Sequence, residues 1–475
     1  MVDLEEWGER FNSFLETDRH RHTEDILLIL YYLINQASFS SVVHKMMKSM
    51  IILIITTLLL TIVNAQCPGN PTGIPVYTES AIYLNATTNG KLYVTGPADN
   101  QVNILQVYGT AYERGYAHGV LLRGEAQEIY AVFFEFVTDM VNELVEKYAK
   151  FIPLWLVDLI ERAGIGAALD ITADLTKKYT PQHFFDEMRG LADGSGLPYQ
   201  TVLRLHMFPE LIKAACSMVG AWGDASIDGN LYQLRALDFK PETPLRLHPV
   251  VIVSHPTDGG DTFATLSWAG FLGALTGYSQ RMGICEKYWF AYNGTSSREG
   301  YPWHFLLRDI LQFDNNPDEA LTRIINAERT CSIYVGLGTN ATNDFRAVEY
   351  SHQVVRVFDD QTPFPAFAPP SAAHPLIKDV VYIDKHVQPS NDPCIGSVLQ
   401  KNHGQINVQT YIDLTAQEQT GDLHIAIYDF AANQMFVSVA TQQGPYPPPA
   451  NFTLVPAYAR QFLQIDLEYF FNESI

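Results

Sequence analysis

Cys216 is the residue whose type and setting most directly suggest chemistry. It follows a small residue, Ala215, and it precedes a short strand-like run, Ser217–Trp222. If the chain were cut before Cys216, that residue would carry a thiol and a free α-amine. An α-amine has a pKa of about 7.7–8.0, so it can take the thiol proton and leave a nucleophilic thiolate. This combination of thiol and α-amine predicts that Cys216 first cleaves the peptide bond on its own N-terminal side. It then attacks a substrate amide and forms an acyl-thioester.

Arg235 and Asp238 are the charged residues expected beside this thiol. A turn rich in Asp, Ser and Gly (224–230) separates the first strand-like run from the one that carries them, which predicts a hairpin. A nearby Arg favours the thiolate, and an Asp can hold the α-ammonium. Positions three apart on a regular strand face opposite sides, so both reach Cys216 only if the strand bends, bulges or ends there. The alternative is a plain ion pair on one strand.

The segments around these three residues resemble the opening of the catalytic chain in the linear-amide C–N hydrolases, a group of N-terminal-nucleophile (Ntn) hydrolases. The matching segments are CSMVGAW from Cys216, DGNLY from Asp228, and LRALDF from Leu234. The resemblance is to the branch that holds acid ceramidase and N-acylethanolamine acid amidase. It implies that Cys216 is the nucleophile, with Arg235 and Asp238 in its site.

Two motifs before Cys216 resemble another branch, the isopenicillin-N acyltransferase-like (C45) proenzymes. They are G-x-x-Y-E-x-G-x-x-H-G, which runs from Gly109 to Gly119, and E-x-x-G-x-A-x-G-x-G, which runs from Glu187 to Gly196. The resemblance implies a four-layer αββα fold, autocatalytic cleavage at Ala215–Cys216, and amidase or acyltransferase chemistry. Within the first motif, we expect Glu113 and His118 to steady the propiece.

Amide cleavage passes through a tetrahedral intermediate with a negatively charged oxygen, the oxyanion, which the enzyme must stabilise. At the position that stabilises it in relatives, this sequence departs from the family pattern. Relatives carry an Asn, often followed by His or Tyr, whereas the corresponding region here has Lys385 before His386. A lysine can stabilise an oxyanion by its charge. Lys385 and Asn343 are therefore the two candidate oxyanion residues, together with backbone N–H groups.

The sequence before and after Cys216 predicts a mixed α+β fold. Three- and four-residue spacing of apolar side chains predicts helices over most of 112–208, and short strand-like runs dominate after Ala215. We expect an Ntn-hydrolase four-layer αββα sandwich preceded by a mainly helical propiece. The predicted boundaries are an upstream extension at 1–45, a signal peptide at 46–65, a propiece at 66–215 and a catalytic chain at 216–475.

Several features predict the secretory pathway, with a secreted or lysosomal protein as the product. Residues 45–65 combine a short basic segment, an apolar run and a small-residue ending, typical of a signal peptide. Five cysteines follow; if four pair, one thiol is left over, and any given four allow three pairings. Five N-x-[ST] sequons also follow, which predicts glycosylation at Asn85, Asn293, Asn340, Asn451 and Asn472.

The composition and the motifs of the sequence limit the classes of molecule that this protein is expected to bind. The net charge of −21, without a basic patch, argues against nucleic acid. Neither H-E-x-x-H nor C-x-x-C occurs, so we expect no metal and no cofactor. The expected partner is a small-molecule or lipid amide, with a membrane contacted only as the substrate's surface, and the propiece stays with the catalytic chain. The alternatives are an acyltransferase that uses the same thioester, a non-catalytic secreted binding protein that kept the fold, and a membrane protein anchored by residues 51–63.

Overall fold

The structure is a computed structural model. It describes residues 67–148, 154–211, 214–363, 374–444, 446–449 and 451–474, and the side chains within 138–163 are not described. From Cys67 onward the chain forms one compact unit. The predicted upstream extension and signal peptide lie outside the described residues. In the part of the chain that is described, no helix is long and apolar enough to cross a membrane.

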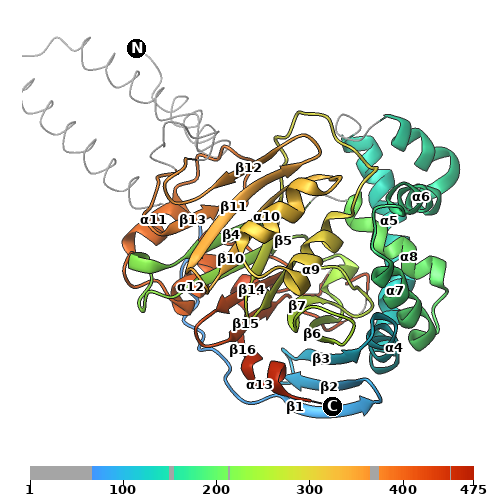
Figure 1. Cartoon of the computed structure of the whole chain (residues 1–475), viewed down its shortest axis with the longest axis horizontal. Helices are drawn as coiled ribbons and strands as arrows, with labels where there is room; N and C mark the ends of the chain where they lie inside the picture. The colour runs from blue at the N-terminus through green and yellow to red at the C-terminus, as the bar shows by residue number, and fades with distance from the viewer. Residues whose placement is uncertain are drawn as a thin grey trace, which may run out of the picture. The chain divides into compact units, whose positions relative to one another are not determined.

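Two β-sheets form the centre of this unit (Figure 1). The six-stranded sheet has the order β13 (Val380–Ile383), β4 (Ala215–Ala221), β5 (Tyr232–Asp238), β14 (His424–Asp429), β15 (Gln434–Val439) and β16 (Leu463–Asp466). The ten-stranded sheet has the order β1 (Ile82–Thr87), β2 (Gly90–Thr95), β3 (Val102–Gly109), β6 (Pro249–Pro256), β7 (Phe263–Trp268), β8 (Thr276–Ser279), β9 (Gly283–Tyr288), β10 (Ser332–Thr339), β11 (Asp344–Ser351) and β12 (Val355–Phe358).

The sheets pack face to face through a buried apolar cluster that draws side chains from both, including Met218 of β4 and Phe345 of β11. They approach closely at Gly220, where an added Cβ would lie 2.1 Å from the Phe345 ring. Helices α11 (Cys394–Lys401) and α12 (Val408–Glu418) pack on the six-stranded sheet. Helices α9 (Trp303–Phe313) and α10 (Pro317–Asn326) pack on the ten-stranded sheet. The mixed α+β class expected from the sequence is confirmed.

The segment before Cys216 supplies strands as well as helices. Strand β3 pairs in parallel with β6, so a strand from before the predicted cleavage bond lies within the same sheet as strands from after it. The described residues before Cys216 are thus mostly helical but also add β1 to β3 to the ten-stranded sheet, and the separation of this segment as a propiece stays a prediction. The helices that follow gather at one side of the sheets in Figure 1: α4 (Ala111–Leu121), α5 (Arg123–Tyr148), α6 (Leu154–Thr176), α7 (Gln182–Ser195) and α8 (Tyr199–Met207).

The two glycine-containing motifs before Cys216 form a close crossing of α4 and α7. A Cβ at Gly115 would lie 2.0 Å from the Glu187 carbonyl oxygen, and one at Gly190 would lie 2.1 Å from the Tyr112 carbonyl oxygen. Only glycine allows backbones to approach this closely. Glu113 caps the start of α4 through a reciprocal pair of bonds with Thr110. The expectation that Glu113 is structural is confirmed.

Candidate active site

Cys216 lies at the start of β4, one residue after Ala215 in the same strand. In the antiparallel pairing with β5, Cys216 is opposite Leu237 and Met218 is opposite Arg235. Because side chains alternate along a strand, Cys216 and Arg235 lie on the same face of the hairpin. The Cys216 side chain is fully buried. The predicted hairpin therefore does bring Arg235 to the thiol.

Arg235 bridges the thiol and a carboxylate that the sequence analysis missed. Its Nη2 lies 3.4 Å from Cys216 Sγ and donates to Glu286 Oε1 at 2.5 Å. Glu286 Oε1 is itself 4.0 Å from Cys216 Sγ. Arg235 is buried, and its Nη1 faces His424 Nε2 at 3.5 Å. One terminal nitrogen of the guanidinium, Nη2, thus contacts both the thiol and the carboxylate, while the other, Nη1, faces His424.

The electrostatics of the uncut chain keep the Cys216 thiol protonated. Its pKa is raised to about 12, chiefly by burial; the Glu286 carboxylate also raises it, whereas Arg235 and Lys287 lower it. Lys287 is also buried and donates to the Lys385 carbonyl oxygen at 2.9 Å. Burial lowers the pKa of its own amine. A base is therefore needed before Cys216 can act as a thiolate near neutral pH.

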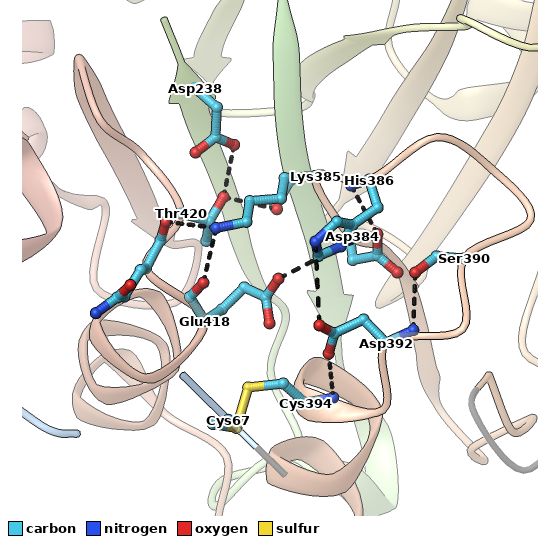
Figure 2. A network of polar contacts seen from close by, with 12 residues as sticks. Cys67, Asp238, Asp384, Lys385, His386, Ser390, Asp392, Cys394, Glu418 and Thr420 are labelled. Carbon is cyan, nitrogen blue, oxygen red and sulfur yellow. Dashed lines mark hydrogen bonds and ion pairs between the residues drawn. A yellow bond between two sulfur atoms is a disulfide. The ribbon is translucent and has the colours of Figure 1, made fainter. Parts of the chain in front are cut away.

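Asp238 lies on the other face of β5 from Arg235, as the three-residue spacing anticipates. It is opposite Ala215, and its carboxylate accepts from Thr420 Oγ1 at 2.7 Å and from the Gly421 N–H at 2.8 Å. Thr420 Oγ1 also lies 2.7 Å from Ser217 Oγ (Figure 2 shows Asp238 and Thr420). Burial raises the pKa of Asp238 to about 6. The carboxylate is thus held beside the strand position that precedes Cys216.

The two candidate oxyanion side chains have other partners. Lys385 Nζ donates to the carbonyl oxygens of Glu418 and Gln419, at 2.9 and 2.8 Å. Its charge lowers the pKa of Asp238, so it acts on that carboxylate. Asn343 is in the turn between β10 and β11 and donates to the Gly229 carbonyl oxygen. Gly229 is in the hairpin turn, at the opposite end of β4 from Cys216. The prediction that Asn343 holds the oxyanion is therefore wrong, because its side chain is bound far from the thiol.

An apolar pocket adjoins the thiol. Leu237, which pairs with Cys216, and Glu286 line it. Its walls come from both sides of the predicted cleavage bond: Ile129, Phe133, Leu205, Phe208, Pro209 and Ala214 before it, and Leu237, Phe239, Leu245, Trp268, Ala269, Phe271, Leu275, Glu286, Tyr288, Trp303, Cys331 and Ile333 after it. Cys216 does not itself line the pocket, but its strand partner Leu237 and its neighbour Glu286 do, so an apolar group in the pocket would lie next to the residues that surround the thiol.

Two buried histidines before Cys216 hold the loop that lines this pocket. His118 Nε2 accepts from the Gly270 N–H at 2.8 Å, and His206 Nε2 accepts from the Leu272 N–H at 2.9 Å. Burial lowers the pKa of both to about 4, so both are neutral and can accept. His118 thus holds a loop of the predicted catalytic chain, whereas the expectation from the sequence was that it steadies the propiece.

The cysteines differ from the expected pattern. One disulfide joins Cys67 to Cys394, while Cys216, Cys285 and Cys331 are free thiols. Cys285 faces the core between the sheets, where its Sγ lies 3.8 Å from Met218 Sδ. The expectation of four paired cysteines is therefore wrong, because these thiols face different surroundings. All five sequon asparagines are exposed, and their glycosylation stays a prediction.

Comparison with known proteins assigns a family. No family model matches the chain. Protein dcd1A of Dictyostelium discoideum is 63% identical over 424 residues, which cover 87% of this chain and 96% of that protein. The chain belongs to the dcd1 protein family. A second dcd1 protein of the same organism, dcd1B, is 52% identical over 406 residues, or 84% of this chain and 81% of that protein.

Outside the dcd1 family, the likeness is weaker. Acid ceramidase of Rattus norvegicus is 24% identical over 186 residues, 34% of this chain and 46% of that protein. Two solved structures overlap the fold at low scores. An N-acylethanolamine-hydrolyzing acid amidase ortholog of Caenorhabditis elegans has a TM-score of 0.35 at 13% identity and covers 48% of this chain and 98% of that one. Penicillin V acylase from Agrobacterium tumefaciens has 0.30 at 10%, with 47% and 83% covered. Membership of the isopenicillin-N acyltransferase-like branch therefore stays a prediction.

Proposed function

We propose that this chain is a self-processing cysteine amidohydrolase of the Ntn type, which cleaves a linear amide through an acyl-thioester on Cys216. The observation that carries the proposal is the position of Arg235, whose guanidinium lies between the Cys216 thiol and Glu286. Asp238 stands opposite Ala215 on the paired strand. The layers described above support the expected αββα sandwich, and the acid ceramidase likeness supports the amide chemistry.

Self-cleavage would begin at the Ala215 carbonyl carbon. The Cys216 sulfur attacks that carbon, the C–N bond to Cys216 breaks, and its nitrogen takes up the thiol proton to become a free amine. Water then hydrolyses the resulting thioester, which leaves Ala215 with a carboxylate. Asp238 is placed to hold the new α-ammonium by charge.

In turnover, the α-amine accepts the thiol proton, and the thiolate attacks the carbonyl carbon of the substrate amide. The C–N bond breaks as the proton passes to the leaving amine, and water releases the acyl group from sulfur. Arg235 stabilises the thiolate by its charge. Backbone N–H groups are the remaining donors for the oxyanion, because Lys385 and Asn343 are engaged elsewhere.

The pocket favours a lipidic acyl group. Its lining is apolar and aromatic apart from Glu286 at the thiol end, so it can bury hydrocarbon while the amide carbonyl stays at Cys216. Because Phe133 and Phe208 line one wall, the propiece would have to stay associated after cleavage. The predicted signal peptide supports an exit through the secretory pathway.

The test is the intact mass of secreted protein, with and without Cys216→Ala, followed by hydrolysis of a panel of N-acyl amides. We expect two chains that meet between Ala215 and Cys216, and one uncut inactive chain in the variant. Cys331→Ala is the matched control, since Cys331 is a free thiol in the pocket wall and should leave cleavage intact. Cleavage of the Cys216→Ala chain at the same bond would refute self-processing. Release of an acylated amine in place of the free acid would favour the acyltransferase alternative.

A further inference from the structure

A group of charged side chains lies behind the Asp238 end of the site, and the mechanism above does not use it. His386, Asp392 and Glu418 each offer one ligand atom, and the three atoms lie within 4.8 Å of one another. His386 and Asp392 come from the segment between β13 and α11, and Glu418 is the last residue of α12 (Figure 2). No local sequence motif marks the group, because its members come from two separate segments.

Glu418 is the observation that points to a ligand. Its side chain is fully buried, and neither of its carboxylate oxygens accepts a hydrogen bond from any residue that the structure describes. Figure 2 shows it extending toward His386, whose Nδ1 lies 3.7 Å from its Oε1. A buried carboxylate without hydrogen bonds is costly unless a cation compensates its charge or it takes up a proton. The ammonium of Lys385 donates to the Glu418 backbone carbonyl oxygen and not to its carboxylate.

Asp384 adds a second buried carboxylate and orients the imidazole. Its Oδ1 lies 3.2 Å from His386 Nδ1 and accepts from the His386 N–H at 2.8 Å, while its Oδ2 is also without a hydrogen bond from the described residues. His386 Nε2 faces Asp392 Oδ2 at 4.0 Å, whereas the ring nitrogen nearest to Glu418 is Nδ1, so a cation held by Nε2 requires the imidazole or the Glu418 side chain to reorient. A carboxylate that holds one ring nitrogen while the other faces the ligand is the usual support of a metal-binding histidine.

We propose that His386, Asp392 and Glu418 bind one divalent transition-metal cation, with Asp384 as the support of His386. One imidazole and two carboxylates suit Zn²⁺ or Mn²⁺. Metal–ligand bonds of about 2.1 Å place ligand atoms roughly 3.4 Å apart in a tetrahedral site, so the side chains need to close by about 1 Å. His386 and Asp392 are partly exposed, which leaves a path for entry and room for a water ligand.

The cation would join two segments that carry the candidate active site. Asp392 accepts from the Cys394 N–H at 2.8 Å, and the Cys67–Cys394 disulfide fixes that end. At the other end, Glu418 precedes Thr420 and Gly421, which hold Asp238. The cation is therefore a positioning element for Asp238; this effect on the active site rests on the proposed function, whereas cation binding itself does not.

The test uses the full secreted chain, stripped with a chelator and titrated with Zn²⁺ and separately with Mn²⁺, which avoids thiols. The same titration of the Cys216→Ala chain removes the nucleophile as a metal ligand. We expect one equivalent bound, and a rise in melting temperature of about 3 °C at a free cation concentration of 100 Kd. Glu418→Gln and Asp392→Asn should each weaken binding by at least ~10-fold, as expected for the loss of a charged ligand.

The matched control is Asp413→Asn, an acidic residue on the same helix whose carboxylate accepts from Gln409. It should bind like the parent. Without metal, Glu418→Gln should melt no lower than the parent, because an amide of similar size replaces a buried carboxyl group that accepts no hydrogen bond from the described residues. Equal binding by the parent and both ligand variants, or no bound equivalent with either cation, would overturn the proposal. Cation binding without an effect on self-cleavage would retain the metal site and remove its link to Asp238.

Discussion

Glu286→Gln tests whether the buried carboxylate controls the reactivity of Cys216. The substitution keeps an oxygen that can accept from Arg235 but removes the negative charge 4.0 Å from Cys216 Sγ. Two unit charges at that distance interact by about 4 kcal/mol at an effective dielectric constant of 20. Since about 1.4 kcal/mol is tenfold in a protonation equilibrium, the thiolate population could rise by up to ~1000-fold. Relaxation around Arg235 reduces this, so we expect at least ~10-fold.

The assay is the alkylation rate of Cys216 by iodoacetamide at pH 7 to 9, measured on the Cys216 peptide by mass spectrometry. Parent and variant are compared in the same processing state, because cleavage itself changes the thiol's surroundings. Glu349→Gln is the control, since Glu349 is also buried in the ten-stranded sheet and pairs with Arg356. It should leave the rate unchanged. An unchanged or slower Cys216 rate in Glu286→Gln would refute the electrostatic reasoning.

Three further predictions concern Asp238, the crossing of α4 and α7, and the buried glutamate Glu210. Asp238→Asn should lower self-cleavage and turnover by at least ~100-fold with little change in melting temperature; equal loss of melting temperature and activity would favour a structural role. Gly190→Ala should cost about 3 kcal/mol or more, because its Cβ would lie 2.1 Å from a helix carbonyl oxygen, whereas Gly124→Ala has open space and should be neutral or stabilising in thermal melts. Glu210 is buried in the short 3-10 helix Phe208–Glu210, where its Oε1 accepts from the Trp303 N–H at 3.0 Å. Burial raises its pKa to about 7, so its protonated form stabilises the fold fully below pH 4.5 and that contribution is lost as the pH rises through 7. Relative to Glu210→Gln, the parent should therefore lose on the order of 3 kcal/mol between pH 4.5 and 7.5, and parallel curves in chemical denaturation would contradict this.

The sequence by itself determined the parts of the site that depend on one hairpin. Cys216, Arg235 and Asp238 lie on neighbouring strands joined by a turn, so their relation follows from strand alternation and a short connection. The same local logic anticipated that Arg235 and Asp238 would face opposite sides. The α+β class also follows, because apolar spacing changes from helical to strand-like near residue 215.

The tertiary structure alone decided which groups surround that hairpin. Glu286 and Lys287 lie on β9, which the sequence did not predict as a strand. A charged pair in a short segment is typical of an exposed turn, and only the tertiary contact with Arg235 shows that Glu286 is buried. Lys385 was a candidate because it occupies the position of the family's asparagine, and Asn343 because it is another asparagine of the predicted catalytic chain. The packing of the β10–β11 turn and of α12 directs both side chains to other partners. His386, Asp392 and Glu418 meet only because two distant segments pack behind Asp238. Contacts within a hairpin follow from chain geometry, whereas contacts between distant segments depend on how whole sheets and helices pack, which no short stretch of sequence encodes.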